Sequence, residues 1–334
     1  MFIPASYPLA VALCVVTMLC WGSWANMQKL ATGRWPFQLF YWDYAIGIVV
    51  FSLLSGLTAG SIGAEGRSFV SDLSQGDLSA FGSAFLGGVI FNIANLLVVA
   101  AIDLAGLAVA FPVGIGLALV LGVVVNYLGA PVGDAGFLFA GVGLVAVAIV
   151  LDALAYGRLS SGREETPRKG ILLALGGGVL MGFFFRFVAE AVTTDFVSPE
   201  PGRLTPYTAV FIFSLGVFVS NFLWNTIFMR KPVKGQPVKY SDYVRLGTGR
   251  LHGIGMLGGA IWCLGMSLSL IASEQAGFAI SYGLGQGATM VAAAWGVFVW
   301  REFEGAPAGT SRLLTAMFAC FIAGLGLIIY ARVA

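Results

Sequence analysis

Charged side chains are scarce in this sequence. Asp, Glu, Lys and Arg make up 10% of its 334 residues, whereas soluble domains carry about a quarter. Hydrophobic residues make up 58%, and the formal net charge is only +2. So small a charge does not form the basic patch with which proteins bind nucleic acid. These proportions predict an all-α, polytopic membrane protein.

Groups suited to catalysis or metal binding are nearly as rare. There is one histidine, His252, and the four cysteines lie in apolar runs without the spacing of metal ligands. The patterns His-x-x-x-His and Gly-x-Ser-x-Gly and the nucleotide-binding Walker loop are all missing. We therefore expect no enzyme activity, no metal, no cofactor and no direct use of ATP. His252 is expected to lie at the membrane interface.

The sequence instead contains many long apolar runs. Each is near the length of about 20 residues that crosses a bilayer as a helix. The first run is too long for a cleavable signal and has no small-residue cleavage site. We therefore expect ten transmembrane helices, at residues 7–31, 36–60, 78–102, 104–127, 134–157, 169–195, 206–229, 250–272, 276–300 and 312–332.

Two segments 171 positions apart resemble each other, residues 87–116 and 258–287. Ten of their thirty aligned pairs are identical, and about one in ten would match by chance, so the excess indicates an internal repeat. Each half holds five spans, an odd number, so the second half starts on the opposite side of the membrane. We therefore expect two inverted five-helix repeats, residues 1–157 and 169–334, joined by a cytoplasmic linker at 158–168.

Basic residues lie mostly on one side of the expected membrane. The connectors after spans one, three, five, seven and nine hold fourteen of the 18 Lys and Arg residues. The other side holds only Arg67, Arg203 and Arg332. Because positively charged loops stay in the cytoplasm, we expect a multi-pass protein of the plasma or bacterial inner membrane with both termini outside the cytoplasm.

Four of the charged residues within or beside the expected spans are candidates for an ion pair or for proton coupling. Asp43 lies about 10 Å into the second span, where a carboxylate must be paired, protonated or hydrated. Its expected partner is Lys29, either in a structural ion pair or beside a proton-coupling site at Asp43. Arg186 and Glu190 lie one turn apart in the sixth span. They either neutralise each other or line a cavity, where Glu190 is the second candidate for proton coupling.

Amide and aromatic residues gather in spans from both halves. They suit either hydrogen bonds between helices or a pocket for a small, mostly uncharged solute. Tryptophan usually lies at the membrane interface, but Trp21 and Trp262 are too deep for that. The expected substrate-binding residues are Trp21, Trp24, Asn26, Asn92, Asn95, Phe111, Asn221, Asn225, Trp262, Tyr282 and Gln286.

Helix-breaking residues recur in the fourth and ninth expected spans. Pro112 removes a backbone hydrogen bond, and glycines follow it at 114 and 116. The ninth span has glycines at 283, 285 and 287, which permit bending or close packing. Broken helices at matching places in two halves are typical of transporters built from repeats.

Four segments carry a family likeness. They are Cys20-Trp-Gly-Ser-Trp24 with Lys29, Tyr41-Trp-Asp-Tyr44, Gly106-Leu-Ala-Val-Ala-Phe-Pro-Val-Gly114 with Asn126-Tyr127, and Ser281-Tyr-Gly-Leu-Gly-Gln286. With them the whole chain resembles the drug/metabolite transporter superfamily, in particular its ten-span branch of ureide permeases, glucose/ribose porters and L-rhamnose–proton symporters. The second segment looks most like ureide permeases and the fourth more like the sugar porters. The resemblance implies a secondary carrier with alternating access and a central cavity lined by both halves.

We therefore expect an uptake carrier for a small neutral polar metabolite, a sugar slightly ahead of a ureide or nucleobase. A proton is the expected coupling ion, bound by Asp43 or else by Glu190. An efflux carrier for amphipathic drugs is the alternative, against which the many amides argue, and a channel also stays open. The sequence leaves the oligomeric state undecided, a homodimer included.

Overall fold

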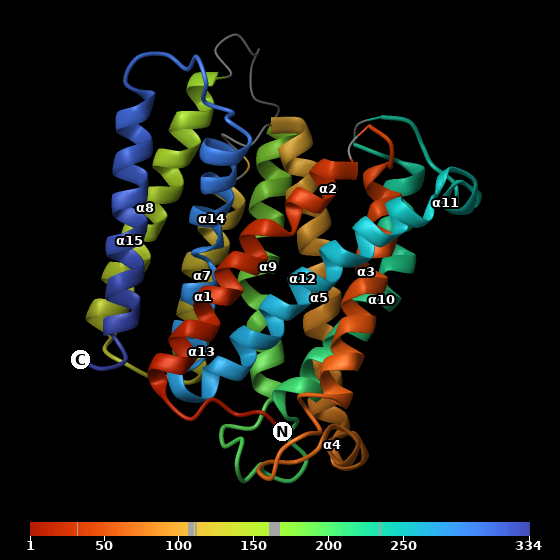
Figure 1. The fold of residues 1–334 in the computed structure, drawn as a ribbon, viewed down its shortest axis with the longest axis vertical. Helices are drawn as coiled ribbons and strands as arrows, with labels where there is room; N and C mark the ends of the chain where they lie inside the picture. The colour runs from red at the N-terminus through yellow and green to blue at the C-terminus, as the bar shows by residue number, and fades with distance from the viewer. Residues whose placement is uncertain (32, 106–109, 111, 160–167, 234) are drawn as a thin grey trace.

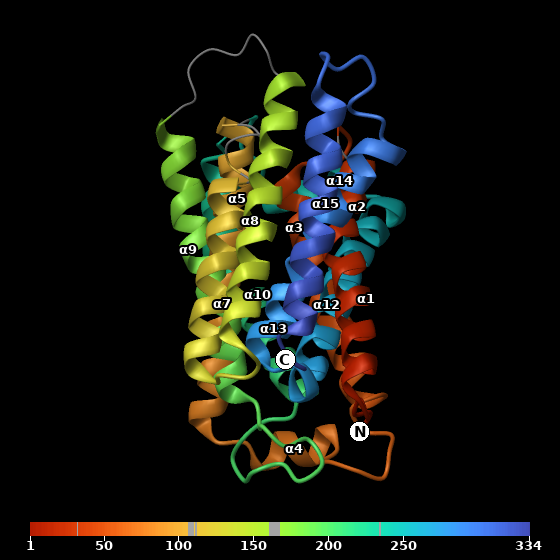
Figure 2. The ribbon, with the colours of Figure 1, turned by 90° about the vertical axis from the view of Figure 1, so that its left-hand side faces the viewer.

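The structure, a computed structural model, describes residues 1–31, 33–105, 110, 112–159, 168–233 and 235–334. It is a bundle of long helices that run side by side (Figures 1 and 2). Within the described ranges the one strand-like feature is an isolated bridge between Val192 and Leu204, which confirms the all-α prediction. The long helices are α1 (Tyr7–Ser23) with its continuation α2 (Ala25–Ala31), α3 (Phe37–Leu57), α5 (Leu78–Ala105), α8 (Ala135–Leu159), α9 (Arg168–Ala191), α10 (Pro206–Arg230), α12 (Gly249–Ala276) and α15 (Thr310–Tyr330).

Eight helices in the described part of the chain are long and apolar enough to cross a membrane. They correspond to all of the predicted spans except the fourth and the ninth, and their bounds agree with the prediction within a few residues. Their faces toward lipid carry large exposed apolar side chains such as Leu19, Leu54 and Phe222. The protein is therefore a polytopic membrane protein, as its composition predicts.

The two remaining spans are the ones that the sequence predicts to be broken. The fourth contains a π-helical turn, η1 (Pro112–Gly116), followed by α7 (Leu117–Gly129). The ninth is divided into α13 (Phe278–Gly285), α14 (Ala288–Ala294) and the π-helical η2 (Trp295–Val299). Glycine is a poor helix former, and its repetition from 283 to 287 accounts for the break between α13 and α14.

The two ends of the bundle differ in what covers them (Figure 1). Both chain termini and the short helix α4 (Phe69–Gln75) lie at one end, which we call the α4 end. Helix α2 and the short helix α11 (Tyr240–Leu246) lie at the other, the α2 end. Helix α8 finishes at the α2 end and α9 starts there, so the fifth and sixth spans run in opposite directions.

Two helix crossings occur in matching places of the two halves. Helix α3 packs on α12, and α10 packs on α5. At the first crossing a Cβ on Gly259 would overlap the carbonyl oxygen of Tyr44, and at the second a Cβ on Gly88 would overlap that of Phe213. Gly88 and Gly259 are 171 positions apart, the offset of the sequence repeat. Each glycine permits two backbones to approach closely, as small residues do between membrane helices.

Candidate functional site

A cavity of about 360 Å³ lies between helices of both halves and reaches the α2 end. Its walls come from α1, α2, α5, η1, α8, α9, α12, α14 and η2. The volume is in the range of pockets that hold small organic ligands. Seven of the predicted site residues line it: Trp21, Trp24, Asn26, Lys29, Asn95, Trp262 and Gln286.

Aromatic rings form one wall of the cavity. The rings of Trp21 and Trp262 are stacked, with centroids 5.9 Å apart and an interplanar angle of 14°. Phe91 lies 4.3 Å from Trp262, centroid to centroid. The Trp21 Nε1–H donates to the carbonyl oxygen of Trp262 over 3.1 Å, which fixes the orientation of the indole. This wall offers rigid flat surfaces to a solute.

Two amide side chains add hydrogen-bonding capacity to this wall. Asn95 Nδ2 donates to the hydroxyl of Tyr41 over 3.2 Å, so that Oδ1 stays available as an acceptor. The side-chain amide of Gln286, at the break between α13 and α14, also lines the cavity. It makes no hydrogen bond within the described part of the chain. A solute with both N–H and C=O groups can pair with these amides.

A polar cluster lies where the cavity reaches the α2 end. Lys29 Nζ is 2.6 Å from Glu302 Oε1 and 4.2 Å from the centre of the Trp300 ring. The Tyr156 hydroxyl donates to Glu302 Oε2 over 2.7 Å, and Trp300 Nε1–H donates to Asn26 Oδ1 over 2.7 Å. The predicted pairing of Lys29 with Asp43 is therefore wrong. The connector between α1 and α3 is short, but Lys29 points across to the segment after η2.

The other predicted binding residues that the structure describes lie outside the cavity lining. Asn92 Nδ2 donates to the Ser220 hydroxyl and Asn225 Nδ2 to the carbonyl oxygen of Gln38, so both link helices. Tyr282 is buried, and its hydroxyl donates to the carbonyl oxygen of Ala118. Asn221 is buried with no hydrogen bond to either amide atom among the described residues. Phe111 lies outside the described residues.

Asp43 is fully buried beside α11 and α12 and does not line the cavity. Its carboxylate accepts hydrogen bonds from Trp35 Nε1 over 2.9 Å and from the Tyr243 hydroxyl. His252 Nδ1 lies 2.8 Å away. Burial and the neighbouring carboxylate raise the pKa of Tyr243, so this hydroxyl keeps the proton that it donates. His252, expected only at an interface, is therefore one of three side chains that contact this carboxylate.

Arg186 and Glu190 do not pair with each other among the described ion pairs, and neither lines the cavity. Glu190 is exposed near the end of α9, where its backbone oxygen accepts a hydrogen bond from Arg203. The Arg186 guanidinium lies against Gly129, at which a Cβ would overlap it. An i, i+4 spacing makes such pairing geometrically feasible, but here the two residues contact different segments.

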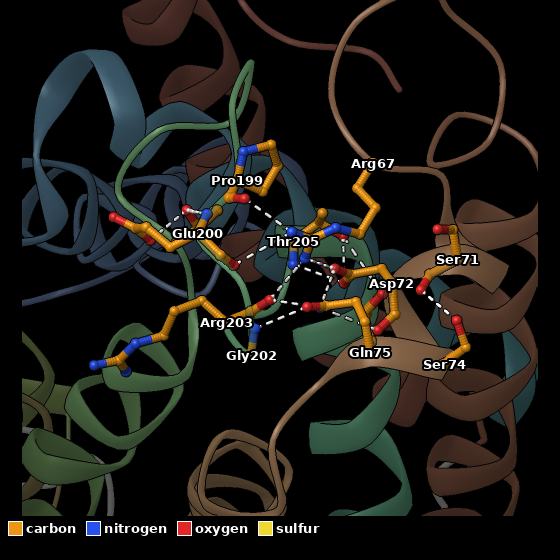
Figure 3. Close-up of polar contacts among 12 residues, drawn as sticks. Arg67, Ser71, Asp72, Ser74, Gln75, Pro199, Glu200, Gly202, Arg203 and Thr205 are labelled. Carbon is orange, nitrogen blue, oxygen red and sulfur yellow. Dashed lines mark hydrogen bonds and ion pairs between the residues drawn. The ribbon is translucent and has the colours of Figure 1, made fainter.

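At the α4 end the two halves are joined by a polar network (Figure 3). Asp72, fully buried, accepts from Arg67 NH1 over 2.9 Å and from the backbone N–H and hydroxyl of Thr205. Arg67 NH2 donates to the carbonyl oxygen of Pro199 over 2.8 Å. Gln75 Oε1 accepts a hydrogen bond from the backbone N–H of Gly202, and Gln75 Nε2 donates to the carbonyl oxygen of Arg203. This network, which we call the α4 latch, connects residues 67–75 with residues 199–205.

Several residues of the cavity were not predicted. Trp295, Trp300 and Glu302 lie at or beyond the end of the ninth span, and Asp152 and Tyr156 lie in the fifth. Asp152 is an acid inside an apolar run, the signal that identified Asp43, so the same reasoning could have found it. Glu302 belongs to a connector, and nothing in its local sequence indicates that it reaches Lys29.

Comparison with known proteins finds similarity to the ureide permeases. The family model described as Ureide permease matches residues 40–169 and 168–331. Ureide permease 5 of Arabidopsis thaliana is 26% identical, over 96% of this chain and 93% of its own. Ureide permease 4 of the same plant is 23% identical over 98% of both chains, and Probable ureide permease A3 of Vigna unguiculata is 25% identical over 80% and 89%.

A solved crystal structure is among those with a similar fold. It covers 97% of this chain and 97% of its own, with a TM-score of 0.61 and 15% sequence identity. At that identity the likeness concerns the fold alone.

Proposed function

Because the chain belongs to the ureide permease family, we propose that it is a secondary carrier for the uptake of a ureide. It is a membrane transport protein rather than an enzyme, as its relatives are named permeases. The proposed substrate class moves from a sugar to a ureide because every relative named above is a ureide permease. A nucleobase, which contains the same N–H and C=O groups in a ring, is the next candidate.

The cavity is the observation that supports this proposal. A ureide group is flat and carries N–H donors beside C=O acceptors. The stacked rings of Trp21 and Trp262 provide an aromatic surface for it, and aromatic faces favour offset stacking. The Oδ1 of Asn95 can accept an N–H, and the Gln286 amide can both donate and accept. Few polar groups on a mainly apolar wall are typical of small-molecule sites.

Alternating access is the proposed mechanism, carried by inverted units at residues 1–157 and 169–334. The repeated crossings of α3 with α12 and of α10 with α5 support it, since each half contributes equivalent helices to the other. The cavity reaches the α2 end, whereas the latch joins the halves at the α4 end. Rocking of one unit against the other would open the second end and close the first.

The charge pattern of the loops supports an assignment of sides. By the positive-inside rule, the basic connectors support a cytoplasmic α2 end, with both termini outside the cytoplasm. The conformation described is then inward-open. Proton coupling is part of the proposal because uphill uptake needs a driving ion where the sequence has no nucleotide-binding loop.

Coupling through Asp43 stays a prediction. The hydrogen bonds from Trp35 and Tyr243 and the contact with His252 are also what a buried structural carboxylate needs. An Asp43→Asn variant that still accumulates solute uphill rules this residue out as the coupling site.

A thermal-shift panel on the purified full-length protein tests the proposed substrate class. Allantoin, hydantoin, uracil, glucose and an amphipathic cationic drug are compared. A ligand that binds only the folded state stabilises it by about 2.7 kcal/mol at a hundred times its Kd. We expect allantoin or hydantoin to raise the unfolding temperature and glucose to have less effect. A shift with the drug alone supports the efflux alternative and contradicts the proposal.

A further inference from the structure

Asp152 is an acid on the cavity wall, and among the described ion pairs it has no basic partner. It lies on α8 seven residues before Leu159, hence about 10 Å from the helix end. The residue is 6% exposed, and its Oδ1 is buried without a hydrogen-bond partner in the described part of the chain. A buried carboxylate oxygen without a donor is costly, and protonation removes that cost.

Few other charged or titratable groups surround Asp152 in the described part of the chain. Three charged residues line the cavity within the described ranges: Lys29, Asp152 and Glu302. The carboxyl groups of Asp152 and Glu302 interact electrostatically, and Tyr156 lies one turn from Asp152 on the same helix. Helix α15, packed on α8, carries Arg312, Cys320 and Tyr330, and α7 carries Tyr127, none of which lines the cavity. The packed turn η1 has no titratable side chain among its residues.

Glu302 is held ionised by its partners. Burial alone would raise the pKa of its carboxyl, but the hydrogen bonds from Lys29 and Tyr156 and the charge of Lys29 lower it overall. The Lys29–Glu302 pair is therefore neutral as a unit. Among the described residues that line the cavity, Asp152 is then the one that sets the net charge: the cavity is negative when Asp152 is ionised and neutral when it is protonated.

We propose that Asp152 is the proton-binding carboxyl of the transport cavity. When the cavity faces outward, one proton from water forms an O–H bond with the carboxylate. When it faces inward, that bond breaks and the proton leaves to cytoplasmic water past Lys29 and Glu302. Closing the cavity around an ionised Asp152 costs several kcal/mol, and closing it around the neutral acid does not. The inference rests on the proposed uptake function.

The protonation itself is tested on the unmodified full-length protein in detergent. A hydrophobic carbodiimide reacts with protonated carboxyls in apolar sites, and peptide mass spectrometry locates the product. We expect Asp152 to be labelled severalfold more at about pH 6 than at about pH 8, and Asp43 and Glu302, which accept charge-assisted or multiple hydrogen bonds, to be labelled less. Equal labelling at both pH values, or none, overturns the inference. This readout needs neither substrate nor a variant.

Coupling is tested by uptake of radiolabelled allantoin into proteoliposomes. A gradient of one pH unit stores about 1.36 kcal/mol, so one proton per solute drives roughly tenfold accumulation. We expect the Asp152→Asn protein to show no accumulation above equilibrium but still to exchange internal for external allantoin. The Asp152→Glu protein should recover part of the accumulation. Glu304→Gln, which removes an exposed acid near the same mouth, is the control.

Failure of the proposed substrate class and failure of the inference about Asp152 give different results. If the unmodified protein does not transport allantoin at all, the proposed substrate class fails, and the labelling experiment still decides on Asp152. If the unmodified protein accumulates allantoin and Asp152→Asn does so equally, the inference about Asp152 fails alone. If Asp152→Asn does not fold, as judged by its unfolding temperature, the labelling result decides.

Discussion

The ring of Trp21 forms part of the cavity wall, where it stacks on Trp262 and is oriented by its own hydrogen bond. A favourable aromatic contact contributes about 0.5–1.5 kcal/mol beyond burial, or roughly two- to tenfold in affinity. We expect Trp21→Ala to raise the KM for allantoin by that factor with a smaller change in kcat. Trp21→Phe keeps an aromatic ring and should raise the KM less.

The matched control for Trp21 is Trp224→Ala, a tryptophan that does not line the cavity. Its KM should be unchanged. Transport kinetics in proteoliposomes measure all three variants, and a Trp21→Ala protein with unaltered KM would show that the solute does not contact this wall.

The Lys29–Glu302 bridge predicts a pH dependence of stability. Its hydrogen bonds and the Lys29 charge outweigh burial and lower the pKa of Glu302, so its stabilisation is present above the ordinary carboxyl pKa of about 4.3 and is lost as the pH falls through the lowered value. Because Lys29 and Glu302 are 43% and 31% exposed, the effect is small, at most about 1 kcal/mol.

Thermal unfolding from about pH 3 to pH 8 measures this dependence. The difference in unfolding temperature between the unmodified protein and Glu302→Gln should be constant near neutral pH and should narrow only at acidic pH. Glu304→Gln, from an exposed pair with Arg301, should show no difference at any pH. A Glu302→Gln difference that grows on acidification would contradict the ion-pair assignment.

At the scale of helices, the crossings of α10 with α5 and of α3 with α12 depend on glycines at matching positions. A Cβ at Gly88 or Gly259 would overlap a backbone carbonyl oxygen, which cannot move without displacing its helix. We expect Gly88→Ala and Gly259→Ala to destabilise by similar amounts, about 1–3 kcal/mol.

Each helix contains its own control for the glycine variants. A Cβ at Gly82 on α5 or at Gly253 on α12 meets nothing within 4 Å. Alanine there should be neutral or slightly stabilising, because alanine favours helix by about 1 kcal/mol over glycine. Unfolding temperatures measure the four variants, and equal losses at all four positions would argue against the close crossings.

The α4 latch is expected to hold the α4 end of the bundle closed, opposite the mouth of the cavity. Asp72→Asn removes the partner of Arg67 from a buried network, which costs about 3 kcal/mol and should accelerate local hydrogen exchange roughly a hundredfold. Hydrogen–deuterium exchange of residues 199–205 measures this. Ser74→Ala, which removes only a local bond to Ser71, should leave the exchange unchanged, and no acceleration in Asp72→Asn would mean that the latch does not close this end.

For the whole molecule, the sequence predicts the membrane class, the eight long spans and both broken ones, because hydropathy and helix breakers act locally. It also predicts that Trp21, Asn95, Trp262 and Gln286 share one cavity, since all four are polar or aromatic groups deep in apolar runs. It does not separate these from Asn92, Asn225 and Tyr282, whose equally deep side chains bond neighbouring helices instead. Which face of a helix meets the cavity depends on tertiary packing, and so does the partner of Lys29.

We propose that this molecule takes up a ureide by alternating access, driven by protons. The most direct test is radiolabelled allantoin uptake by proteoliposomes containing the unmodified chain, with and without an inside-alkaline pH gradient. We expect saturable uptake that rises severalfold above equilibrium with the gradient and returns to equilibrium when a protonophore is added. Uptake that never exceeds the level of protein-free liposomes, or that ignores the gradient, would contradict it.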